Sequence, residues 1–117
     1  MGRMNLLVKK LSDAEAMTSD FETDPVMIET SNNVGIWIET AGVTTNTGTF
    51  TVQVRAYKDE NNKSGWVDLA TTYTLANANA SFFRKELSLP NCQIRVKFVG
   101  AGTPTGTADI WLSATGS

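Results

Sequence analysis

Residues Phe50–Tyr57 read FTVQVRAY, a run in which apolar and polar side chains alternate. Alternation with a period of two is typical of a β-strand that has one buried side and one solvent-facing side. We expect the inward set to be Phe50, Val52, Val54 and Ala56. We expect the outward set to be Thr51, Gln53, Arg55 and Tyr57. Because a slip of one residue would expose the whole apolar set, the register of this strand should be well fixed.

Similar short segments follow one another along the chain and are separated by Gly, Asn, Pro and Thr. The predicted strands cover residues 5–10, 26–30, 34–40, 50–57, 66–69, 73–75, 81–87, 92–98 and 108–114. Turn signals recur about every 8–12 residues, and no helix of normal length is expected. These observations predict an all-β fold, an antiparallel two-sheet β-sandwich with jelly-roll-like connections and about eight strands.

The first 24 residues are less regular than the rest, so we divide the chain into an N-terminal segment, 1–24, and a β-sandwich domain, 25–117. Ser12–Glu15 matches a capping box, but the run after it is too short for more than a turn. The segment is either an arm that lies across a neighbouring subunit or a first edge strand followed by a loop. Residues 1–40 carry seven acids and three bases. This excess is either ordinary solvated surface or an acidic arm that docks on a basic face.

The residue types leave little room for catalysis. The 117 residues contain no histidine and one cysteine, Cys92. This excludes Ser-His-Asp and Cys-His catalysis and nearly every zinc site. Alternation places Cys92 on the same side of its strand as Ile94 and Val96, so we expect a small buried residue. The loop Asp59–Gly65 departs from a calcium-binding loop at its ligand positions. We therefore expect no enzyme, and no catalytic, cofactor-binding or metal-binding residues.

Charge and hydropathy limit the classes of partner that we expect this chain to bind. The net charge is −2, whereas a dedicated nucleic-acid binder normally has a basic excess. No stretch approaches the roughly 18 apolar residues of a membrane span. We expect neither nucleic acid nor membrane as a partner.

The aromatic residues divide by side. Trp37 falls opposite Val34, Ile36 and Ile38, so it is either packed under a loop or exposed at an interface, where tryptophan is enriched. Phe82 and Phe83 are adjacent and must point to opposite sides of their strand. Trp66 and Trp111 stand in predicted strands and are expected in the core. The candidate interface set is Trp37, Phe82, Phe83, Leu6, Leu7, Val8 and Phe21.

Several of these segments together resemble a known group of proteins. The runs are TFTVQV (49–54), GWVDL (65–69), Tyr73–Leu75, Ser81–Phe83, IRVKF (94–98) and GTADIWLSA (106–114). Over residues 21–117 the chain resembles the small all-β virion structural proteins of tailed bacteriophages. The shared motifs are structural and not catalytic.

The resemblance implies a virion protein, and we expect a capsid decoration or cement protein on the capsid surface. Its expected partner is the major capsid protein, and its expected state is a homotrimer. Adhesion through aromatic residues and the N-terminal segment is the expected mechanism. The alternative is a tail or fibre module that binds host carbohydrate. An enzyme fragment or accessory domain, or a cellular β-sandwich, are further alternatives.

Overall fold

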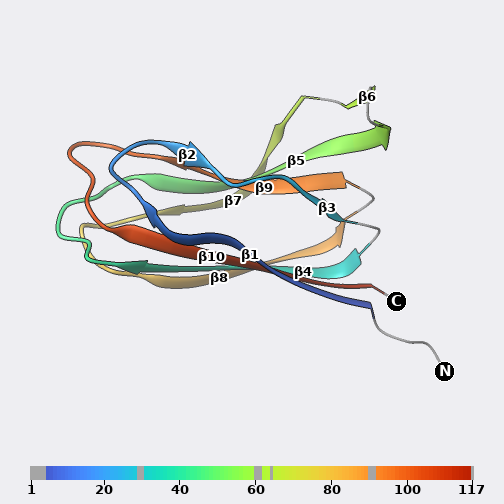
Figure 1. Cartoon of the computed structure of the whole chain (residues 1–117), viewed down its shortest axis with the longest axis horizontal. Coiled ribbons are helices and arrows are strands. Elements are labelled where there is room, and N and C mark those ends of the chain that lie inside the picture. Colours follow the sequence, from blue (N-terminus) through green and yellow to red (C-terminus); the bar gives the residue numbers. More distant parts are fainter. Residues whose placement is uncertain (1–4, 29–30, 60–61, 64, 90–91, 117) are drawn as a thin grey trace.

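The computed structural model describes residues 5–28, 31–59, 62–63, 65–89 and 92–116. Within these ranges the chain forms ten strands and no helix. The strands make two antiparallel layers that face each other, and the start of the first strand lies beside the end of the last, with Asn5 opposite Gly116 (Figure 1). The predicted all-β sandwich is confirmed.

The first layer is a four-stranded sheet with the order β1-β10-β4-β8. Its strands are β1 (Asn5–Ala16), β10 (Thr107–Gly116), β4 (Ser31–Ala41) and β8 (Ser81–Leu89). Neighbouring strands pair antiparallel, so β1 and β8 are the edges. Two register shifts interrupt β1 near Ser12, where the strand bends along β10.

In the second layer, β9 (Cys92–Val99) and β5 (Thr49–Asp59) form the centre. The short strands β2 (Phe21–Glu22) and β3 (Val26–Ile28) both pair with β9. On the other side β7 (Val67–Thr74) pairs with β5. The end of β5 pairs only with β6 (Asn62–Lys63) and extends beyond the sandwich (Figure 1).

The connections are those of a jelly roll. The chain crosses from one sheet to the other between successive principal strands, except from β5 to β7, which pair within the second sheet. Strands β1, β4, β8 and β10 lie in the first layer, and β2 with β3, β5 with β7, and β9 lie in the second. Because β2 and β3 both pair with β9, they act as one interrupted strand. The short strand β6 pairs with the end of β5 and is not counted among the principal strands. Eight principal strands in two facing sheets match the predicted architecture.

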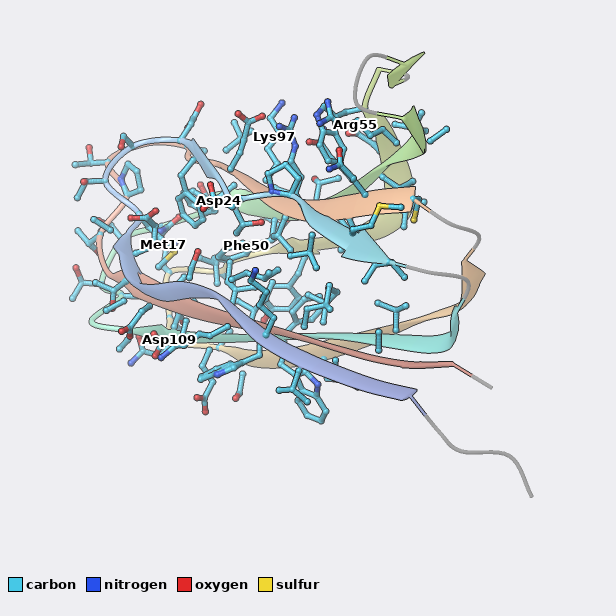
Figure 2. The ribbon with its side chains drawn as sticks, turned by 45° about the vertical axis from the view of Figure 1, so that its right-hand side comes forward. Met17, Asp24, Phe50, Arg55, Lys97 and Asp109 are labelled. Atoms are coloured by element: carbon cyan, nitrogen blue, oxygen red, sulfur yellow. The ribbon has the colours of Figure 1, made fainter. Side chains whose placement is uncertain are left out.

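The core lies between the sheets and follows the predicted alternation. Val34, Ile36 and Ile38 of β4 are at most 2% exposed. Figure 2 shows Phe50 between the two layers, with Arg55 and Lys97 on the outer side of the second sheet. Ala56 was predicted to face inward but is exposed. Beyond Ala56, β5 pairs only with β6 and no longer faces the other sheet.

Two further expectations need correction. Residues 66–69 and 73–75 were predicted as separate strands, but 67–69 and 73–74 belong to the single strand β7, with Trp66 before it and Leu75 after it. Ser12–Glu15 forms part of β1 and not a turn, because pairing with β10 continues through this region. Of the two alternatives for the N-terminal segment, the structure shows residues 5–16 as an edge strand of the chain's own sheet.

Hydrogen bonds between loops fix the end of the sandwich opposite the termini. The buried side chain of Asn46 donates from Nδ2 to the Thr105 carbonyl (3.1 Å) and accepts from the Gly48 amide at Oδ1 (2.8 Å). The backbone N–H of Asn46 donates to Asn77 Oδ1 at 2.9 Å. These bonds join the loops that follow β4, β7 and β9. They hold in place the ends of the strands that carry the site described next.

Candidate functional site: an aromatic row on the four-stranded sheet

Three aromatic side chains lie in one row across the outer side of the first sheet. In the antiparallel register Trp111 of β10 is opposite Trp37 of β4, and Trp37 is opposite Phe83 of β8. Neighbouring strands lie about 4.8 Å apart, so the three rings are direct neighbours. Trp37 is 48% exposed and Phe83 is 40% exposed. We call Trp111, Trp37 and Phe83 the aromatic row.

A glycine sets the position of two of these rings. The Trp37 and Phe83 ring centroids are 4.1 Å apart, with 35° between the ring planes. A Cβ atom on Gly35 would lie 2.9 Å from Phe83 Cε1 and 3.3 Å from Trp37 Nε1. The rings therefore lean over the Gly35 backbone, as aromatic residues do beside a glycine in a sheet. A side chain at position 35 would lift them.

The aromatic row lines an open groove with a volume of about 550 Å³. Val8 of the edge strand β1 adds a further apolar side chain and is 64% exposed. Glu39, Ser81 and Ser113 supply the polar groups of the groove. It is a mainly apolar surface whose lining includes one carboxylate and two hydroxyls.

One end of the aromatic row is covered by a lysine of the same chain. Lys10 Nζ lies 5.0 Å from the Trp111 ring centroid, 2.9 Å from Asp13 Oδ1 and 3.8 Å from Asp109 Oδ1. The hydrogen bond to Asp13, opposed by desolvation and supported by the nearby charges of Asp13 and Asp109, raises the pKa of Lys10 above 10.5. Lys10 therefore makes a cation–π contact with Trp111, and the carboxylates of Asp13 and Asp109 lie close to its ammonium group.

The outer side of the second sheet has a different character. Trp66 lies against two guanidinium groups, with Arg95 Cζ 4.1 Å and Arg55 Cζ 4.5 Å from its ring centroid. Arg95 also binds Glu22 (2.8 Å) and donates from Nε to Gln53 Oε1 (2.8 Å). The acidic N-terminal region thus contacts a basic side chain of its own domain.

Two hydrogen bonds extend this polar network. Gln53 Nε2 donates to Asp68 Oδ1 at 2.7 Å, and Arg55 Nε donates to Gln93 Oε1 at 2.7 Å. These partners sit on neighbouring strands in direct register. We call Glu22, Gln53, Arg55, Trp66, Asp68, Gln93 and Arg95 the polar network.

The expectation that Trp66 and Trp111 lie in the core is wrong. Trp111 alternates with Ile110 and Leu112, which are fully buried, so its ring lies on the outer side. Trp66 precedes β7 and covers arginine side chains instead of entering the core. The alternation over residues 108–114 indicates that Trp111 faces outward. The prediction of a buried Trp111 relied instead on the usual burial of tryptophan. Glu39 and Gly35 were also missed, because their role depends on neighbours from other strands.

The predicted interface residues separate into groups. Trp37, Phe83 and Val8 meet in the groove. Phe82 points inward, is 9% exposed and lies 4.6 Å from the Tyr73 ring. Phe21 packs on Phe98 (5.4 Å) on the second sheet, away from the groove. The side chains of Leu6 and Leu7 lie outside the described part of the structure. The interface role of all these residues stays a prediction.

The described residues contain no group of three or more His, Cys, Asp or Glu side chains that could hold a metal ion. Cys92 is buried as predicted, and desolvation raises the pKa of its thiol. Among the described segments there is no helix with the length and apolar character needed to cross a membrane.

Comparison with known proteins adds information on the fold. No protein-family model matches the chain, and neither does any curated protein. A chain in the solved structure of infectious bursal disease virus, Gx strain, matches with 12% identity and a TM-score of 0.61. The match covers 98% of this chain and 32% of that chain, so our chain spans about a third of the viral chain's length. This likeness shows a shared fold.

A second match is the crystal structure of the SPBc2 prophage-derived protein YomS. The identity is 14% and the TM-score is 0.40, with 98% of this chain and 96% of that chain covered. A TM-score at this level does not establish a common fold.

Proposed function

We propose that this protein is a structural component of a virus particle, a decoration or cement protein that binds the capsid surface by adhesion. The observation that carries the proposal is the aromatic row, because two of its three side chains are 40–48% exposed on a regular sheet. Tryptophan and phenylalanine are enriched where proteins bind other proteins. The jelly roll is a fold used by viral capsid proteins, although fold alone does not establish function. The motif resemblance to phage virion proteins supports the same role.

The size of the exposed surface is suited to the centre of a contact. The exposed parts of Trp37, Phe83 and Val8 together amount to an apolar area on the order of 300 Å². A stable interface buries about 800 Å² per partner. The aromatic row therefore supplies the core of the proposed contact, and surrounding polar residues supply its rim. The partner we propose is the major capsid protein, bound by a homotrimer of this chain.

The test is binding to particles that lack the protein, prepared from the virus that carries this sequence. Trp37→Ala should weaken binding by roughly 30-fold, the effect expected of an interface hot spot. Two of the exposed valines, Val8 and Val67, provide a matched pair. Val8→Ala, in the groove, should weaken binding several-fold, and Val67→Ala, on the second sheet and 58% exposed, should leave it unchanged.

If the Trp37→Ala variant occupied particles as fully as the wild-type protein, the aromatic row would have no part in the binding mechanism. Deletion of residues 1–24 is a poor test, because it removes β1 from the first sheet. The mass of the purified protein in solution tests the homotrimer separately.

A second candidate is binding of host carbohydrate. The groove combines exposed rings with the hydroxyls of Ser81 and Ser113, which favours this alternative. Binding to a glycan array that is lost in Trp37→Ala, together with no binding to particles, would favour it over adhesion to a capsid.

A further inference from the structure

The same pair of side chains occurs on two neighbouring strands of the first sheet. On β10, Asp109 and Trp111 are two residues apart and lie on the outer side, and on β4 the same is true of Trp37 and Glu39. The antiparallel register sets Trp111 opposite Trp37 and Asp109 opposite Glu39. The sheet therefore carries two copies of one acid–tryptophan arrangement side by side.

The copy on β10 holds a cation. Lys10 Nζ lies 5.0 Å from the Trp111 ring centroid and 3.8 Å from Asp109 Oδ1, with Asp13 as a further carboxylate partner at 2.9 Å. The Ala14 amide also donates to Asp109 Oδ1 at 2.6 Å. The charge of Asp109 is therefore balanced within the chain.

The copy on β4 lacks such a cation among the described residues. Glu39 is exposed, and the hydrogen bond it accepts from Ser81 Oγ is long, at 3.4 Å. Trp37 is 48% exposed. Glu39 also lies directly opposite Asp109, another carboxylate, so its cross-strand neighbour on β10 offers it no opposite charge. A cation beside Glu39 would balance its charge and lie next to the half-exposed ring of Trp37.

We propose that Trp37 and Glu39 form a recognition site for an arginine side chain of the protein partner. The inference rests on the proposed function, in which the aromatic row contacts a protein neighbour, and it names the chemistry of that neighbour. A guanidinium group is planar, stacks on aromatic rings and binds carboxylates through two parallel N–H donors. It matches a flat ring beside a carboxylate better than an ammonium group does.

The site can be tested on the isolated protein with a small probe. N-acetyl-arginine amide is titrated into ¹⁵N-labelled protein, and the indole N–H signals of the three tryptophans are followed by NMR. The Trp37 signal should shift with a dissociation constant on the order of 10 mM, as a single exposed contact of this kind implies. The Trp66 signal should stay in place, because two arginines already lie against that ring. N-acetyl-citrulline amide, which has nearly the same shape and no charge, should bind at least about tenfold more weakly.

Variants separate the specific carboxylate from general electrostatics. Glu39→Gln should weaken binding of the arginine probe by about three- to tenfold. Asp24→Asn is the matched control, since it removes one exposed negative charge near the second sheet and should change binding by less than about 1.5-fold (Figure 2). Equal binding of both probes, or equal effects of the two substitutions, would overturn the cation site. So would a Trp37 shift with methyl glucoside and none with the arginine probe.

Particle binding distinguishes this inference from the proposed function. If Trp37→Ala abolishes particle binding and Glu39→Gln leaves it unchanged, adhesion stands and the arginine site is wrong. If the arginine probe binds as expected and the wild-type protein does not bind particles, the site stands and its protein partner is not the capsid.

Discussion

The outer sides of the two sheets use similar residues in opposite ways. On the second sheet, Trp66 is covered by Arg55 and Arg95, and Arg95 is paired with Glu22. On the first sheet, Trp37 is half exposed, and its neighbour Glu39 has no cation among the described side chains. The polar network finds its partners within the chain, whereas the aromatic row leaves an aromatic ring and a carboxylate open to an external partner.

This difference separates stability from binding. Contacts completed within the chain contribute to folding, and their loss lowers the free energy of unfolding. Exposed groups contribute little to folding, and a contiguous exposed apolar patch is typical of a surface that contacts another molecule. The two tryptophans, Trp66 and Trp37, therefore allow the comparison to be tested directly.

The largest effect on the free energy of unfolding is expected for a residue of the core, which lies between the two sheets and supports both. Phe98 is fully buried, and its ring lies 4.8 Å from Phe50 and 5.4 Å from Phe21. Phe98→Ala should lower the free energy of unfolding by about 3–5 kcal/mol, because it leaves a cavity. Urea denaturation measures the change. A loss below about 1 kcal/mol would mean that the faces do not share this core.

An intermediate effect is expected for the tryptophan of the polar network. Trp66→Ala should lower the free energy of unfolding by about 1–3 kcal/mol, because it removes contacts with two arginines and part of a buried surface. Trp37→Ala should change it by less than about 1 kcal/mol. Both values come from the same denaturation experiment. A larger loss for Trp37→Ala would assign the aromatic row to folding and weaken the comparison.

The smallest effect concerns the cation already on the aromatic row. The pKa of Lys10 is raised chiefly by its hydrogen bond to Asp13. A raised pKa in the folded state means that this contribution to stability is fully present below the unfolded-state pKa, near 10.4 to 10.5. It is lost as the pH rises through the higher folded-state value. Asp13→Asn should move the Lys10 pKa down, which an NMR titration of the Lys10 side chain measures. An unchanged value would contradict the role of Asp13.

Much of the fold was predictable because alternation is a local property. The run Phe50–Tyr57 predicted β5, and residues 92–98 predicted β9 with Cys92 facing the core. Strand ends were less certain, because pairing extends strands past the points where alternation is clear. β1 is the clearest case, since its pairing with β10 runs through Ser12–Glu15, where a turn was expected.

The candidate site was predicted only in part, for the same reason. The exposure of Trp37 follows from alternation in its own strand, and the opposite directions of Phe82 and Phe83 follow from their adjacency. That Trp111 stands beside Trp37 depends on strands that lie about 70 residues apart in the sequence, and no local pattern contains their pairing. The separation of Phe21 from the groove was hidden for the same reason.

The sequence alone determined the all-β class, the inward sides of most strands and the absence of histidine chemistry, since these depend on residue types and on nearest neighbours. Tertiary structure decided the strand order, and with it which outward residues find partners. Trp66 lies against two arginines of its sheet. Trp37 lies against the ring of Phe83 and near the carboxylate of Glu39, which has no cation among the described residues. Long-range pairing made that choice, because the charge or ring opposite a side chain is set by the neighbouring strand and not by the residues beside it in the chain.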